Sequence, residues 1–212
     1  MKPAFTLVEI LVVLAIIAML LGAAVNGLGQ LRGNMEAEQA TVQLMSYLQQ
    51  QQNQAKNNVI DYNNLPPAVS SGISNKALAT VIHFDSTTPS NVKIQQEYCW
   101  KDLGSAATWI AAITTGKCTT ASDIPSIAGV TYTSLTPSPV PVPALSNPCK
   151  YVVFENLTEQ VYTYDSTNTL LDNSSLHKSC RINIETQYFK NPNPPYKYLN
   201  FLSNGSYNVT AP

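Results

Sequence analysis

The chain opens with MKPAFTLVEILVVLAIIAMLLGAAV (residues 1–25), an apolar run that contains one acidic residue, Glu9. No charged residue follows between Ile10 and Leu31. A helix over that stretch would be about 33 Å long, which is enough to cross the hydrocarbon core of a bilayer. A carboxylate inside such a segment is disfavoured by roughly 2.5–3.5 kcal/mol on insertion scales. The position of Glu9 therefore needs an explanation.

Two ordinary kinds of N-terminal segment fit this hydropathy. A cleaved signal peptide would use small residues such as Gly22 and Ala24 near its cut site, and a plain signal anchor would stay as a membrane helix. Lys2 before the run and Arg32 after it predict one crossing with an outer C-terminal domain. Neither kind explains Glu9, because a buried carboxylate needs a partner and no Lys or Arg lies within one helical turn.

A third kind of segment supplies that partner. The stretch KPAFTLVEILVVLAII resembles the prepilin signal of type IV pilins and type II secretion pseudopilins. The resemblance implies cleavage between Ala4 and Phe5 by a prepilin peptidase and N-methylation of Phe5. It also implies that Glu9 pairs with the N-terminal amine of a neighbouring subunit, and opposite charges attract strongly at low dielectric. The chain would then comprise a leader (1–4), a transmembrane and assembly helix (5–32) and an exported head (33–212).

Two positions depart from the usual pattern of this family. Ala4 stands where Gly is usual before the cut, and Asn26 stands where many major pilins carry Pro. Gly22, Gly27 and Gly29 predict a local softening of the helix instead. The missing proline favours a minor subunit over a major one.

Beyond Arg32 the pattern becomes amphipathic. Apolar residues at intervals of three, four and seven predict that one helix runs from about Phe5 to about Asn57. The apolar positions that recur in this second half are Ala37, Ala40, Leu44, Leu48 and Ala55, with Val59 four residues further on. The glutamine-rich stretch 49–54 continues this helix and predicts a solvated face.

Strand-like segments fill the rest of the chain, with turn clusters between them. They are ALATVIHF (77–84), NVKIQQEYCW (91–100), IAGVTYTSL (127–135), KYVVFENL (150–157), QVYTYD (160–165), CRINIETQYF (180–189) and YLNFLSNGSYNV (198–209). The proline-rich segment 136–148 predicts a surface loop. A long helix followed by these segments predicts an α+β domain in which the helix packs on a mostly antiparallel sheet.

This order of elements resembles the pilin fold. The stretches LMSYLQQQQNQAKNNVI (44–60) and YLNFLSNGSYN (198–208) resemble segments of the FimT/FimU-type minor pilins and the H-type pseudopilins. The second match is a weak pattern, because Asn-Gly between strands is also a common hairpin turn.

Four cysteines predict two disulfides behind an export segment. Four cysteines allow three connectivities, and the shorter loops favour Cys99–Cys118 and Cys149–Cys180. The alternative is four buried free thiols. No pair has the C-x-x-C spacing of zinc or thioredoxin-like sites.

The head contains no recognisable catalytic motif, so we expect a non-enzymatic protein without cofactor or metal. His83 and His177 are far apart in sequence, and His83 is expected to be structural. The segment 165–173 offers the oxygen donors Asp165, Asn168, Asp172 and Asn173. It lacks the Gly and Glu spacing of a calcium loop, so it predicts a polar turn.

Nucleic-acid binding is an alternative function. Net charge is −1, from 12 basic and 13 acidic residues, so the chain as a whole has no general attraction for nucleic acid. Basic residues do alternate with aromatic ones near the C-terminus, which could hold single-stranded DNA. The residues are Lys178, Arg181, Lys190 and Lys197, with Tyr188, Phe189, Tyr196 and Tyr198. The other interpretation is a solvated strand face over core aromatics.

The sequence therefore predicts a structural subunit, a minor pilin or pseudopilin, of a type IV pilus or type II secretion filament. It would reside in the inner membrane as a single-pass protein and then enter a periplasmic or cell-surface filament with other pilins or pseudopilins. The alternatives are a major pilin, a DNA-binding minor pilin and, more remotely, a signal-anchored enzyme.

Overall fold

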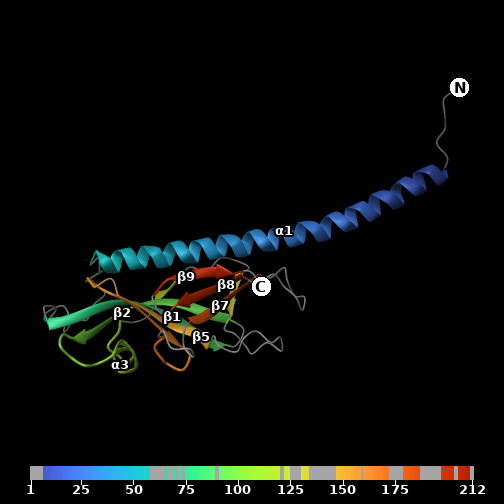
Figure 1. The fold of residues 1–212 in the computed structure, drawn as a ribbon. Coiled ribbons are helices and arrows are strands. Elements are labelled where there is room, and N and C mark those ends of the chain that lie inside the picture. Colours follow the sequence, from blue (N-terminus) through green and yellow to red (C-terminus); the bar gives the residue numbers. More distant parts are fainter. Residues whose placement is uncertain are drawn as a thin grey trace.

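The computed structural model describes residues 7–57, 65, 69, 72, 75–88, 91–119, 122–124, 130–133, 147–158, 160–171, 179–186, 197–202 and 205–210. One long helix, α1 (Leu7–Lys56), precedes a nine-stranded sheet. Figure 1 shows the first half of α1 projecting away from the head and the second half lying along the sheet. The predicted α+β class is confirmed.

Helix α1 is continuous because its sequence lacks proline and is rich in Leu, Ala and Gln, which favour helix. It runs through Gly22 and Gly29, where no other part of the described structure comes within 4 Å of an added Cβ. The predicted softening near the glycines does not interrupt the helix, which curves gently in Figure 1. The glutamine-rich stretch 49–54 continues the helix, as predicted, but it is not wholly a solvated face, since Gln51 is 4% exposed.

The sheet has the strand order β3-β2-β1-β5-β7-β8-β9, while β4 pairs with β7 and β6 pairs with β5. The strands are β1 (Lys76–Thr88), β2 (Asn91–Asp102), β3 (Ser122–Asp123), β4 (Val130–Thr133), β5 (Asn147–Glu155), β6 (Val161–Asp165), β7 (Ser179–Thr186), β8 (Lys197–Leu202) and β9 (Tyr207–Thr210). Neighbouring strands are antiparallel except for β5 and β7, which pair in parallel over two residues. Each predicted strand has a counterpart.

Two elements were not predicted. A short helix, α3 (Trp109–Thr114), follows β2, and its first turn is capped by the Thr108 hydroxyl, which accepts from the Ala111 amide. The two-residue strand β3 pairs with β2 at the edge of the sheet. Residues 134–146, which hold most of the predicted proline-rich loop, lie outside the described residues.

The core lies between α1 and one sheet face. The apolar positions predicted within α1 are all buried: Ala37, Ala40, Leu44, Leu48 and Ala55. Val59, the next position of that row, lies outside the described residues. Most of the buried positions pack in one cluster with side chains that alternate inward along β1, β5, β7 and β8, such as Phe84, Phe154, Ile182 and Phe201. Small residues on the helix let its backbone approach the sheet, and burial of the larger ones drives the packing.

A second core covers the opposite sheet face. Trp109 and Ala112 of α3 pack on Ala79 and Val81 of β1 and on Val153 of β5. Trp109 is 1% exposed, so the short helix covers this face and closes its core to water.

Candidate functional site

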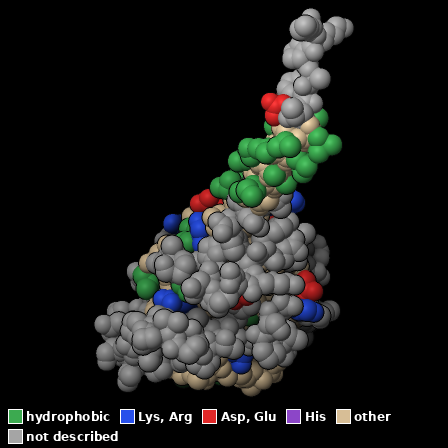
Figure 2. Space-filling model, turned by 90° about the vertical axis from the view of Figure 1, so that its right-hand side faces the viewer, with side chains coloured by type: hydrophobic (Ala, Val, Ile, Leu, Met, Phe, Trp, Pro, Cys, Tyr) green, Lys and Arg blue, Asp and Glu red, His purple; other side chains and the backbone are tan. Residues whose placement is uncertain are grey.

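The projecting half of α1 is the most unusual surface of the molecule. Its large apolar side chains are exposed around the whole helix rather than along one stripe. Figure 2 shows them gathered on the visible face of this half. They are Leu7, Val8, Ile10, Leu11, Val12, Val13, Leu14, Ile16, Ile17, Met19, Leu20 and Leu21. Exposed apolar surface of this extent marks an interaction site in a folded protein.

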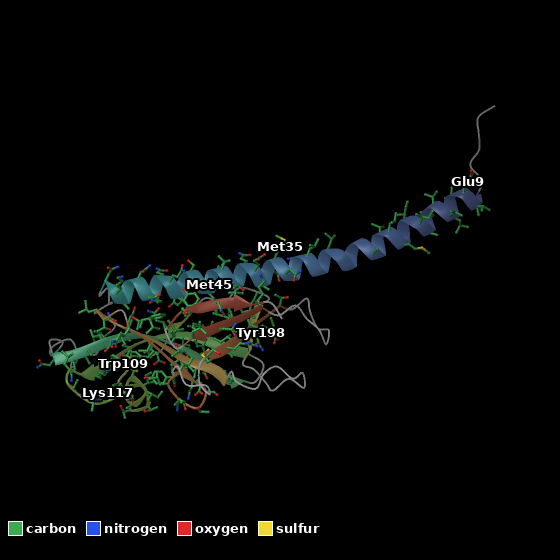
Figure 3. All side chains as sticks on the ribbon, in the orientation of Figure 1. Glu9, Met35, Met45, Trp109, Lys117 and Tyr198 are labelled. Atoms are coloured by element: carbon green, nitrogen blue, oxygen red, sulfur yellow. A yellow bond between two sulfur atoms is a disulfide. The ribbon has the colours of Figure 1, made fainter. Side chains whose placement is uncertain are left out.

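Glu9 lies in the first turns of this apolar surface, at the end of α1 farthest from the head (Figure 3). Its neighbours Val8 and Ile10 are 67% and 53% exposed. A carboxylate near a helix N-terminus is stabilised by the helix dipole. The chain therefore presents one negative group within an apolar surface.

Within the described residues, no helix meets the length and hydropathy required of a membrane-crossing helix. The predicted single membrane crossing is therefore not confirmed and stays a prediction. The cleavage and methylation positions, Ala4 and Phe5, lie outside the described residues.

Polar contacts join the second half of α1 to the head at several points along the helix. Lys197 of β8 pairs with Glu38 at 3.0 Å, and the Tyr207 hydroxyl donates to the Met45 carbonyl at 3.2 Å. Further along, the Tyr47 hydroxyl donates to the side chain of Gln96. The Gln96 amide in turn donates to Gln51 at 3.1 Å.

The side chains of the Tyr47 network are partly buried. Burial raises the pKa of Tyr47, with a smaller effect from nearby Tyr98. The end of the helix is also tied down, because the Leu157 amide donates to the Ala55 carbonyl at 3.2 Å. The second half of the helix is therefore held on the head by contacts along its length.

Two disulfides cross-link segments of the head. They join Cys99 to Cys118 and Cys149 to Cys180, which are the pairs that the shorter loops favour. The first bond closes the segment that carries α3, and the second joins β5 to β7. The carboxylate of Glu97 lies close to the first pair, within 4.8 Å of both sulfurs. Those sulfurs are bonded to each other, so they do not offer thiolate ligands for a metal.

The proposed basic patch is divided by the sheet. Arg181 donates to Asn200 at 2.7 Å and stacks over Tyr198 on the face away from α1. Lys197 points to the other face, where it binds Glu38 of α1. The structure does not bring these two cations together, and Lys178 and Lys190 lie outside the described residues. The described part of the patch gives no support to DNA binding.

The described residues considered for catalysis or calcium binding make contacts that fit a structural role. His83 Nδ1 lies 3.6 Å from Glu97 Oε1, and its ring stacks against Tyr151. Asp165 is fully buried, and its Oδ1 accepts from the Thr167 amide, the Thr167 hydroxyl and the Thr169 amide. That geometry is a hydrogen-bonded turn. Asp172, Asn173 and His177 lie outside the described residues.

Comparison with known protein families gives a match at the N-terminal end of the chain, which includes the first part of the apolar half of α1. Residues 2–25 match the family described as the prokaryotic N-terminal methylation motif. No curated protein and no solved structure matches the chain. The N-terminus therefore carries a prepilin signal of the type IV pilin class, while the match does not extend to the head.

Proposed function

We propose that the protein is a non-catalytic subunit, a minor pilin or pseudopilin, of a type IV pilus or type II secretion filament. The observation that supports this most strongly is the methylation motif at residues 2–25, which runs into one unbroken helix that ends beneath the head. A helix with exposed apolar side chains, packed by its second half on a head that two disulfides cross-link, suits a filament built by packing helices.

In this proposal the leader 1–4 is removed between Ala4 and Phe5, and Phe5 is N-methylated. The apolar part of α1 resides in the inner membrane before assembly and then packs among the helices of other subunits. Glu9 pairs with the N-terminal amine of a neighbouring subunit, so each charge relieves the other's burial. The head, from about residue 33, faces outward and contacts other subunits or cargo.

The first experiment is incorporation of the full-length chain into sheared filaments from its host. Glu9→Ala and the isosteric Glu9→Gln should both be processed, fold their heads and stay out of filaments, because neither has the charge. Gln39→Ala, a polar position of the same helix, is the matched control and should enter normally. Normal incorporation of Glu9→Gln would contradict the role of the charge.

The second experiment identifies the machine. Surface pili are counted on cells that lack the gene. Loss or a sharp reduction would assign the protein to pilus assembly, and normal piliation with impaired secretion would assign it to the type II secretion filament. Normal piliation with normal secretion would contradict the proposal.

A further inference from the structure

The sheet ends at β9, and one edge of this strand pairs with no other strand of the described structure. β9 is hydrogen-bonded to β8 on its other side. Its residues, Tyr207 to Thr210, include no charged residue, no proline and no bulge, which are devices that block an exposed strand edge in many proteins. At the opposite end of the sheet, β3 is only two residues long. The free edge of β9 is therefore a candidate interaction surface.

The hydrogen bonds of the last hairpin show which backbone groups of β9 face this edge. The Leu202 amide donates to the Ser206 carbonyl at 2.8 Å, and the register continues without a shift along β8 and β9. Hydrogen-bonded and non-hydrogen-bonded pairs alternate between antiparallel strands, so the backbone groups of Asn208 point to β8. The N–H and C=O groups of Tyr207 and Val209 therefore point outward, to the free edge.

A flank of α1 lies beside the same edge and is partly apolar. Lys197 of β8 binds Glu38 at 3.0 Å. Tyr207 of β9 donates to the Met45 carbonyl at 3.2 Å, so the last two strands lie next to this stretch of the helix, and Figure 1 shows β9 close beneath α1. Val42 stands one turn from both Glu38 and Met45, within about 60° of each around the helix. Its side chain is 61% exposed. We call Val42 and the outward backbone groups of β9 the edge site.

The chemistry of the edge site indicates what covers it. Alternating N–H and C=O groups along a strand are complemented by another extended backbone, as in recognition by strand addition. The edge site itself is uncharged, and its exposed side chain is apolar. An extended polypeptide with apolar residues is therefore the ligand that matches both parts.

A second copy of this chain is a poor match for the edge site. Antiparallel pairing of β9 with β9 of a second copy would relate the chains by a two-fold axis across the sheet. Because α1 lies along the sheet, that operation would point the two helices in opposite directions, whereas copies inserted by the same N-terminal signal point the same way. The β3 edge of a second copy is too short to pair along the whole of β9.

We infer that the free edge of β9 binds an extended segment of a different polypeptide as an added strand. Successive side chains of that segment would alternate between the two faces of the sheet. Those on the α1 face would lie beside Val42 and the partly buried Met45, so apolar residues suit these positions. Those on the other face would lie beside Asn208, which is exposed, so polar residues suit the positions between them. This inference goes beyond the proposed function, since it concerns a ligand of the head and not filament assembly.

The test measures binding of a labelled peptide to the purified full-length chain in detergent, by fluorescence anisotropy. The peptide alternates threonine and valine and has lysine at both ends for solubility. The control peptide has the same side chains and N-methyl groups on its inner amides, so it has no N–H groups to donate to a strand edge. We expect the first peptide to bind and the second to show no binding. No binding of the first peptide, or equal binding of the two, would overturn the inference.

Variants of the protein locate the bound peptide. Val209→Pro removes an outward N–H and leaves the bonds between β8 and β9 in place, so binding should be weaker by about tenfold or more. Val209→Ala keeps the N–H and should lose far less. Val42→Gln should also weaken binding, and Gln43→Ala, exposed on another side of α1, is the matched control and should not. Undiminished binding by Val209→Pro would overturn the inference. The N-methylated peptide tests the same point with the wild-type chain, in case Val209→Pro does not fold.

Two further measurements distinguish the other occupants and the filament role. A wild-type dimer that is absent from Val209→Pro, in sedimentation experiments without peptide, would assign the edge to a second copy and overturn the inference. Glu9→Ala should bind the peptide as the wild type does, even though its entry into filaments is lost. Loss of binding in Glu9→Ala would show that the peptide binds the apolar half of α1 and not the edge site, and would overturn the inference without affecting the filament role.

Discussion

Gly205, in the turn between β8 and β9, lies directly against Val161 at the start of β6. A Cβ built on Gly205 would be 2.4 Å from the Val161 Cβ. The φ angle of Gly205 is +76°, in the left-handed region that favours glycine. The contact joins the C-terminal hairpin to the middle of the head.

Gly205→Ala should therefore destabilise the protein by about 2–4 kcal/mol, because a methyl group overpacks the contact and the backbone angle disfavours alanine. Gly104→Ala is the matched control. Gly104 has a φ of +75° but open space around it, so only the conformational effect of about 1 kcal/mol remains. Denaturant unfolding measures both, and equal losses would contradict the close contact.

Leu48→Ala should lower the free energy of unfolding by about 2–5 kcal/mol, since a large buried side chain is lost from the helix–sheet core. Leu48 is 0% exposed. Gln43→Ala, exposed on the same helix, should change stability by less than about 0.5 kcal/mol. Similar effects of the two substitutions would show that the helix does not pack on the sheet by this face.

Each disulfide should stabilise the head chiefly by restricting the unfolded chain. Sequence separations of 19 and 31 residues correspond to about 3 and just under 4 kcal/mol at 25 °C. We expect the paired substitutions Cys99→Ala with Cys118→Ala, and Cys149→Ala with Cys180→Ala, each to lower the melting temperature. Addition of reductant to the wild-type protein should produce the combined shift, and an unchanged melting temperature would contradict both bonds.

Stability should fall at alkaline pH partly because of Tyr162. Burial, followed by the hydrogen bond and charge of Glu155, raises the pKa of Tyr162 to about 12 from 10.0. A raised pKa in the folded state means that this contribution is fully present below pH 10 and is lost as the pH rises to about 12. Tyr162→Phe should make the decline in stability between these values shallower. An identical pH profile for the variant would contradict the shift.

Asp165→Ala should destabilise the turn after β6 by about 1–3 kcal/mol, because donors that it now satisfies would lose their buried acceptor. Asp165 is 0% exposed. Asp165→Asn keeps an acceptor oxygen and should lower the stability by less than Asp165→Ala does.

We also expect that neither calcium nor a chelator shifts the melting temperature. A calcium-dependent increase would show that the segment 165–173 binds an ion.

Much of the architecture could be predicted from local patterns. Ala40, Leu44 and Leu48 recur at the helical period, so their spacing alone defines the face of α1 that meets the sheet. The strands were predictable because β-branched and aromatic residues alternate between turn clusters. Helix α3 was not predicted, because its six residues are too few to show a hydrophobic period. Trp109 becomes part of the core only in the folded structure, where it packs on β1 and β5.

The N-terminal signal, the position of Glu9 and the α+β order could be read from the sequence alone, because these depend on residue type and short-range spacing. Tertiary structure decided which side chains share a surface. Arg181 and Lys197 looked like one basic patch along the chain, yet the pairing of β7 and β8 places them on opposite faces of the sheet. The same packing leaves Met35 exposed, because the sheet covers only one side of α1. A one-dimensional pattern does not contain that information, since strand pairing and helix docking bring together residues that are far apart in the sequence.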